Sequence, residues 1–170
     1  MHVIILPGFS PHNLSWAEDI KSDLQDLGTV DIVHWPHWET GKTERDWIEI
    51  ESEKIANSIG ENKVSIIAKS VGTIIAMDVL KIKLNNVERL ILCGVSIKSF
   101  QENDEVRFQI LSKVDSRKVA VFQNIGDPHG APEDIGKLIH KYNPDIQITK
   151  KPRSDHEYPY VEVFAEFLTI

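Results

Sequence analysis

Cysteine and long apolar runs are both scarce in this sequence. Its only cysteine is Cys93, which excludes a disulfide framework and a cysteine-rich metal site. No stretch approaches the roughly 18 apolar residues of a membrane-spanning helix. The apolar run in the opening "MHVIILPGF" is also too short for a signal peptide. From these absences we expect a cytoplasmic protein with no membrane partner.

Basic residues are few relative to acidic ones. The chain has 19 Lys and Arg against 26 Asp and Glu, a formal net charge of −7. No basic block interrupts this balance, and phosphates would repel so acidic a chain. We therefore expect no nucleic-acid partner.

The remaining composition is that of an ordinary globular protein. Apolar residues make up 41% of the chain and charged residues 26%. A length of 170 residues suits one domain, and no linker, repeat or shift in composition divides the chain. We predict a single domain over residues 1–170, whose oligomeric state stays open.

Short apolar runs alternate with segments of helical periodicity along the whole chain. Strands are predicted at 2–6, 29–35, 63–68, 87–95, 118–123 and 145–149. Helices are predicted at 16–27, 44–59, 71–84, 103–113, 131–141 and 158–168. This alternation predicts right-handed crossovers and a parallel sheet between two helical layers, a three-layer α/β/α sandwich.

The character of each predicted strand indicates its place in the sheet. The strands at 29–35 and 145–149 alternate polar and apolar residues, as edge strands do, whereas the other four are nearly continuous apolar runs. Numbered along the chain, the six strands should follow the order 2-1-3-4-5-6. This order reverses between the first and third strands, and ligands of such sheets bind beyond the carboxyl ends at that point.

A serine, an acid and a histidine are expected at this edge. Ser70 follows the third strand in "IIAKSVGT", Asp127 follows the fifth in "GDPHGAP", and His156 precedes the last helix in "SDHEY". A serine needs a nearby base to act as a nucleophile. Each residue also has a plainer interpretation: a helix N-cap, a turn former before proline and a surface histidine.

These motifs resemble those of the α/β-hydrolase superfamily. "AKSVG" is similar to its G-x-S-x-G nucleophile elbow, with Ala68 in place of the first glycine, and the chain order Ser, Asp, His is the one that superfamily uses. "LPGFS" is similar to its oxyanion loop, with Pro7 where histidine is common. The resemblance implies a minimal α/β-hydrolase fold without a large lid.

The resemblance also implies roles for the residues. Ser70 would be the nucleophile, His156 the base, and Asp127 the group that orients the imidazole. The backbone N–H groups of Phe9 and Val71 would form the oxyanion hole. No cofactor is needed for this chemistry, and none is expected.

Other residues near the strand ends are ambiguous. His12, Trp35 and Trp38 are candidates for a substrate pocket, with ordinary packing as the alternative. The histidines after the strands lack the spacing of a strong metal motif, so no metal is expected. Lys69, beside the candidate nucleophile, is most simply a solvated lysine.

The sequence thus predicts a serine hydrolase that cleaves a small-molecule ester or thioester through an acyl-enzyme. One alternative is an acyltransferase or peptidase with the same three residues. Another is an inactive hydrolase fold that serves as a binding or interaction protein. The natural substrate is not encoded in a triad.

Overall fold

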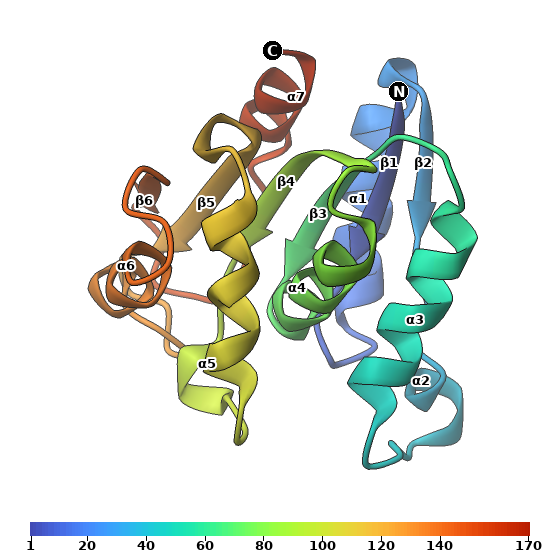
Figure 1. Cartoon of the computed structure of the whole chain (residues 1–170), viewed down its shortest axis with the longest axis horizontal. Coiled ribbons are helices and arrows are strands. Elements are labelled where there is room, and N and C mark those ends of the chain that lie inside the picture. Colours follow the sequence, from blue (N-terminus) through green and yellow to red (C-terminus); the bar gives the residue numbers. More distant parts are fainter.

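Six parallel strands form one sheet in the computed structural model, which describes residues 1–170 (Figure 1). The order is β2-β1-β3-β4-β5-β6, as predicted. The strands are β1 (His2–Leu6), β2 (Thr29–Ile32), β3 (Val64–Lys69), β4 (Val87–Cys93), β5 (Val119–Asn124) and β6 (Ile148–Lys151). Their carboxyl ends lie at one edge of the sheet, opposite the two chain termini (Figure 1).

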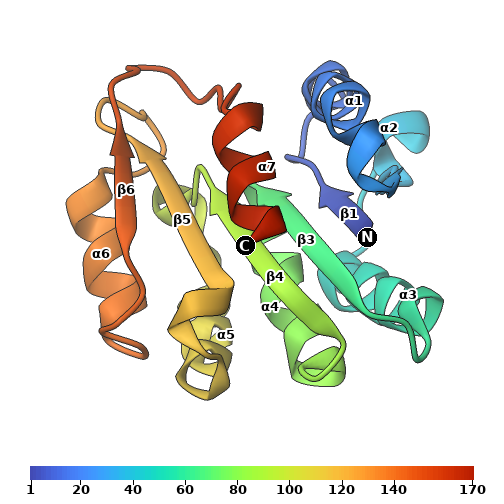
Figure 2. The same cartoon turned by 90° about the horizontal axis from the view of Figure 1, so that it is seen from above.

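Helices cover both faces of the sheet (Figure 2). They are α1 (Asn13–Leu24), α2 (His37–Thr40), α3 (Trp47–Ile59), α4 (Val71–Lys83), α5 (Asp104–Arg107), α6 (Pro132–His140) and α7 (Val161–Thr169). One apolar cluster joins α3, α4 and α6 to one face of the sheet, and another joins α1 and α7 to the other. None of the helices combines the length and apolar character that crossing a membrane requires.

Alternation along the central strands explains how one sheet serves two cores. In β3, Ile66 and Ala68 belong to the first cluster while Ile67 belongs to the second. Successive side chains of a strand point to opposite faces, so a strand buried on both sides is mostly apolar. This is why the central strands could be recognised as continuous apolar runs.

Several predicted boundaries are wrong, including the first two helices, which are Asn13–Leu24 rather than 16–27 and Trp47–Ile59 rather than 44–59. β2 ends at Ile32 rather than 35, since the chain then leaves the sheet toward α2, a short helix that was not predicted. β6 covers Ile148–Lys151 rather than 145–149. The helix predicted at 103–113 is α5 followed by a 3-10 helix at Phe108–Lys113. The last helix begins at Val161 rather than 158, because Pro159 disfavours helical geometry in the residue before it.

Candidate functional site

Ser70 occupies the sharp turn between β3 and α4. Its φ of 56° makes it one of only two non-glycine residues with positive φ, a conformation that costs energy for a side chain with a Cβ. Hydrogen bonds hold the strained turn: the Ser70 N–H donates to the Cys93 carbonyl at 3.1 Å, and the Thr73 N–H donates to the Ser70 carbonyl at 2.9 Å. Ser70 is thus presented at the carboxyl edge of the sheet.

Gly72 allows this turn to pack against β1. A Cβ added to Gly72 would lie 2.1 Å from the carbonyl oxygen of Leu6 and 2.9 Å from that of Pro7. The start of α4 and the loop after β1 therefore approach each other more closely than any side chain at position 72 permits.

Asp127 and His156 are in direct contact. Nδ1 of His156 lies 2.7 Å from Oδ2 of Asp127, whose side chain is fully buried. Because an ionised carboxylate only accepts, Nδ1 carries the proton and Nε2 of neutral His156 is left free to take one. Burial acts to raise the pKa of Asp127, but hydrogen bonds from His156, Tyr158 and the His129 N–H outweigh it, so this pKa lies below its ordinary value.

Tyr158 holds the Asp127 carboxylate through a hydrogen bond, a role that was not predicted. Its hydroxyl donates to Oδ2 of Asp127 at 2.5 Å and accepts from the Asn124 N–H at 3.1 Å. The Asn124 side chain donates in turn to the carbonyls of Asp155 and Glu157, on either side of the histidine. Burial of the phenol raises the pKa of Tyr158, so the hydroxyl stays neutral and keeps its proton.

Ser96 lies between the candidate nucleophile and the candidate base. Its Oγ is 3.0 Å from Oγ of Ser70 and 3.5 Å from Nε2 of His156. The Gly94 carbonyl lies 3.3 Å from the same oxygen, so the single Ser96 proton has more than one acceptor within reach. Ser70 and His156 make no direct hydrogen bond. Ser96 was not singled out from the sequence, although it follows β4 as Ser70 follows β3.

Ser70, Ser96 and His156 line a cavity of about 550 Å³. Its apolar lining comes from Phe9, Trp47, Ile48, Val71 and Ile74. Its polar lining comes from Ser10, Asn13, Ser70, Ser96, Ser99, Gln101, Asp104, His129 and His156. The hydroxyls of Ser70 and Ser96 and the imidazole of His156 therefore border one cavity. Its volume is that of a small-molecule site.

The residues predicted for the substrate pocket do not line this cavity. Trp35 is 1% exposed and belongs to the apolar core. The indole of Trp38 is directed to the Phe9 carbonyl at 2.8 Å. The His12 side chain is 78% exposed and lies 3.9 Å from Glu157. An aromatic residue from α3, Trp47, takes the place that Trp35 was expected to fill.

The two residues predicted to supply the oxyanion donors border the same cavity as Ser70. Phe9 and Val71 both line it. Val71 is the first residue of α4, where the helix supplies no carbonyl for its N–H. The Phe9 N–H makes no hydrogen bond within the protein. Both N–H groups therefore lack a partner in the regular secondary structure.

Lys69 is buried rather than solvated, which corrects the simpler interpretation of the sequence. It is 1% exposed, and its Nζ donates to Oε2 of Glu157 at 3.1 Å. The ammonium also lies 5.1 Å from the centre of the Trp16 ring. This ion pair joins the residue before Ser70 to the residue after His156.

Neither a reactive thiol nor a metal-binding cluster accompanies these residues. Cys93 is buried, and burial raises the pKa of its thiol, so it stays protonated. No group of three or more His, Cys, Asp or Glu side chains is arranged to hold a metal ion.

Comparison of the sequence with protein-family models and with curated proteins finds no match. Solved structures do match. Alpha/beta hydrolase domain-containing protein 10 from mouse is 11% identical, with a TM-score of 0.72 over 99% of this chain and 88% of that one. A lidless α/β serine hydrolase from Xanthomonas campestris is 13% identical, with a TM-score of 0.71 over 99% and 78%.

A thermophilic esterase from Thermogutta terrifontis is 11% identical, with a TM-score of 0.70 over 99% of this chain and 89% of that one. Together with the strand order, these matches show that the chain has the α/β-hydrolase fold in a minimal form. The fold implied by the sequence motifs is confirmed.

Proposed function

We propose that this protein is a serine hydrolase that cleaves a small ester or thioester through an acyl-enzyme on Ser70. The observation that carries the proposal is that His156, held on one side by the buried Asp127, lines the same cavity as the strained Ser70 turn. A structural histidine would not need a buried carboxylate on one nitrogen and a cavity on the other. The hydrolases of the same fold support the reaction class.

In the proposed reaction, Oγ of Ser70 attacks the acyl carbon while Nε2 of His156 takes the hydroxyl proton. Asp127 holds the Nδ1–H and stabilises the imidazolium. The tetrahedral oxyanion accepts hydrogen bonds from the N–H groups of Phe9 and Val71. His156 then protonates the leaving alcohol or thiol, and water activated by the same nitrogen releases the acid.

Ser96 offers one of two routes for the first proton transfer. Because Ser96 Oγ lies between Ser70 and His156, the proton passes either through the Ser96 hydroxyl or directly, after rotation of Ser70 about χ1. Catalytic hydrogen bonds often form only when substrate binds. In Ser96→Ala the relay is lost, so a kcat close to that of the wild type would identify the direct route.

Hydrolysis of p-nitrophenyl acetate and reaction with a fluorophosphonate probe test the function. The wild type should hydrolyse the ester and become labelled, and Ser70→Ala should do neither. Ser15→Ala, a change on α1 outside the cavity, is the control and should behave as the wild type. A folded wild type that neither turns over esters nor takes the probe would instead support a binding protein.

A further inference from the structure

The buried indole of Trp35 orients the loop after β1. Its Nε1–H donates to the carbonyls of Pro7 at 3.3 Å and Gly8 at 3.2 Å. The peptide between Gly8 and Phe9 is trans, so its C=O and N–H point in opposite directions. With the Gly8 carbonyl directed at the indole, the Phe9 N–H points away from it and stays free of protein partners.

Two further side chains hold the next carbonyl of the loop. Nε2 of His37 lies 2.7 Å from the Phe9 oxygen, and the Trp38 Nε1–H donates to the same oxygen at 2.8 Å. Since a carbonyl only accepts, Nε2 of His37 carries a proton. The Phe9 ring also stacks on the His37 ring, with centroids 4.3 Å apart and an interplanar angle of 20°.

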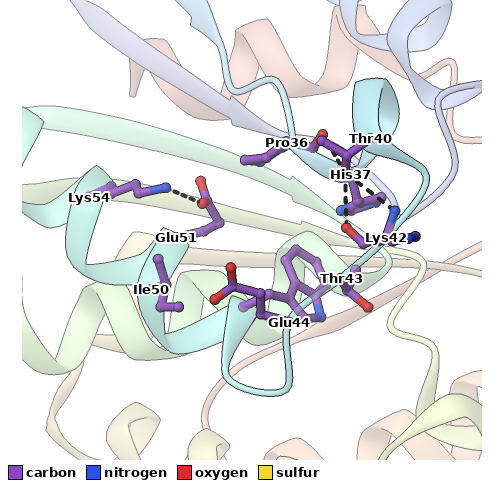
Figure 3. Close-up of a pocket in the computed structure, with 10 residues that line it drawn as sticks. Pro36, His37, Thr40, Lys42, Thr43, Glu44, Ile50, Glu51 and Lys54 are labelled. Atoms are coloured by element: carbon purple, nitrogen blue, oxygen red, sulfur yellow. Dashed lines mark hydrogen bonds and ion pairs between the residues drawn. The ribbon is translucent and has the colours of Figure 1, made fainter.

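Apart from these contacts, the Phe9 ring meets the edge of the Trp47 ring, with centroids 5.8 Å apart. The Phe9 side chain is 51% exposed, and residues 7–10 belong to no helix or strand. On its other side His37 borders a small cavity of about 180 Å³ between α2 and α3, whose lining residues are drawn in Figure 3. His37 does not line the cavity that contains Ser70, so it holds the loop from outside the candidate active site.

We propose that Trp35, His37 and Trp38 form an oxyanion-loop clamp: they hold the carbonyls of Gly8 and Phe9 so that the Phe9 N–H faces the oxyanion formed at Ser70. They are positioning residues, since none lines the cavity that contains Ser70. The inference rests on the proposed function. It gives Trp35 and Trp38 a role different from the substrate contacts predicted for them.

The clamp predicts non-additive losses of activity. Each phenylalanine variant removes a donor and keeps an aromatic ring. Because His37 and Trp38 hold the same oxygen, His37→Phe or Trp38→Phe alone should lower kcat by less than about threefold, and the double variant by about tenfold or more. Trp35→Phe, whose donor has no substitute, should lower kcat by about 10- to 100-fold. KM should stay within about twofold throughout.

The matched control is His140→Phe. It removes a similar contact, from Nε2 of a histidine to the Ile146 carbonyl at 2.8 Å, in the segment between α6 and β6. It should leave kcat unchanged. His37→Gln combined with Trp38→Phe restores an N–H donor and should recover most of the activity that the double phenylalanine variant loses.

A boronic acid inhibitor provides the readout that a merely structural role would not change. Its tetrahedral adduct with Ser70 places an oxygen in the oxyanion hole, so its affinity should fall by the same factor as kcat/KM. If the double variant melts within a few degrees of the wild type but keeps its kcat and boronate affinity, the clamp is wrong and the function stands. If the folded wild type is inactive, the proposed function itself fails. Should Trp35→Phe not fold, the His37 and Trp38 variants alone decide.

Discussion

The ion pair between Lys69 and Glu157 should respond very differently to the loss of each partner. Lys69 is 1% exposed, whereas Glu157 is 40% exposed. Glu157→Gln leaves a buried ammonium without a counter-charge. Lys69→Met leaves a carboxylate that water already reaches and fills the volume of the lysine stem with an apolar chain. Glu157→Gln should therefore destabilise the protein more than Lys69→Met does.

The expected magnitudes follow from that difference. Breaking a buried pair costs about 3–5 kcal/mol of unfolding free energy. We expect the low end, about 3 kcal/mol, for Glu157→Gln, because water reaches part of the pair and the Trp16 ring lies near the ammonium. For Lys69→Met we expect a loss below about 1 kcal/mol. The double variant should recover most of the loss of Glu157→Gln, since no unpaired charge stays buried.

Urea denaturation monitored by tryptophan fluorescence measures these changes. The matched control is Glu133→Gln, which breaks a pair with Lys150 in which both side chains are more than half exposed, and it should change the midpoint little. Equal losses for Glu157→Gln and Lys69→Met, or a double variant as unstable as Glu157→Gln, would refute the reasoning.

Two further predictions concern the site. Tyr158→Phe removes a donor to Asp127 and should raise its pKa toward the ordinary value near 3.8. A lowered carboxyl pKa stabilises the fold at pH values above the ordinary pKa, and this stabilisation is lost as the pH falls. As the pH rises from 2 to 6, a range set around the carboxyl pKa, the variant should therefore gain less stability than the wild type. Urea titrations in which the two proteins gain equal stability over this range would contradict the prediction. Gly72→Ala forces a Cβ against the Leu6 carbonyl, so it should lower the free energy of unfolding by about 1–3 kcal/mol and abolish labelling by the fluorophosphonate probe. Labelling at the wild-type rate would show instead that the turn accommodates a side chain.

The sheet could be predicted because its strands differ in pattern. β3, buried on both faces, has an apolar run at residues 66–68, whereas β2 alternates polar and apolar residues. The order of strands, the switch point and the placement of Ser70 follow from that difference and from the rules of parallel crossovers. The boundaries of strands and helices were less predictable where contacts with distant segments set them. The end of β2 is an example, because the chain leaves the sheet there and Trp35 is buried in the core.

The parts of the site that sequence reasoning missed depend on tertiary contacts. Tyr158 and Ser96 are ordinary residues in the sequence, and only the meeting of β4, β5 and the loop before α7 places them beside Asp127 and Ser70. Lys69 gave no sign of burial, because its partner lies 88 residues away. One signal was present in the sequence: a polar residue within a few positions of the end of a buried strand, as with Ser96, reaches the same edge as Ser70.

Identifying the serine that carries the fluorophosphonate tests the central claim most directly. Ser70 and Ser96 have their hydroxyls 3.0 Å apart, and Ser96 is the one within 3.5 Å of His156, so the choice between them is a real one. Peptide mapping of the labelled wild type by mass spectrometry should find the adduct on Ser70, and Ser96→Ala should still be labelled there. An adduct on Ser96, or labelling that survives Ser70→Ala, would contradict the account.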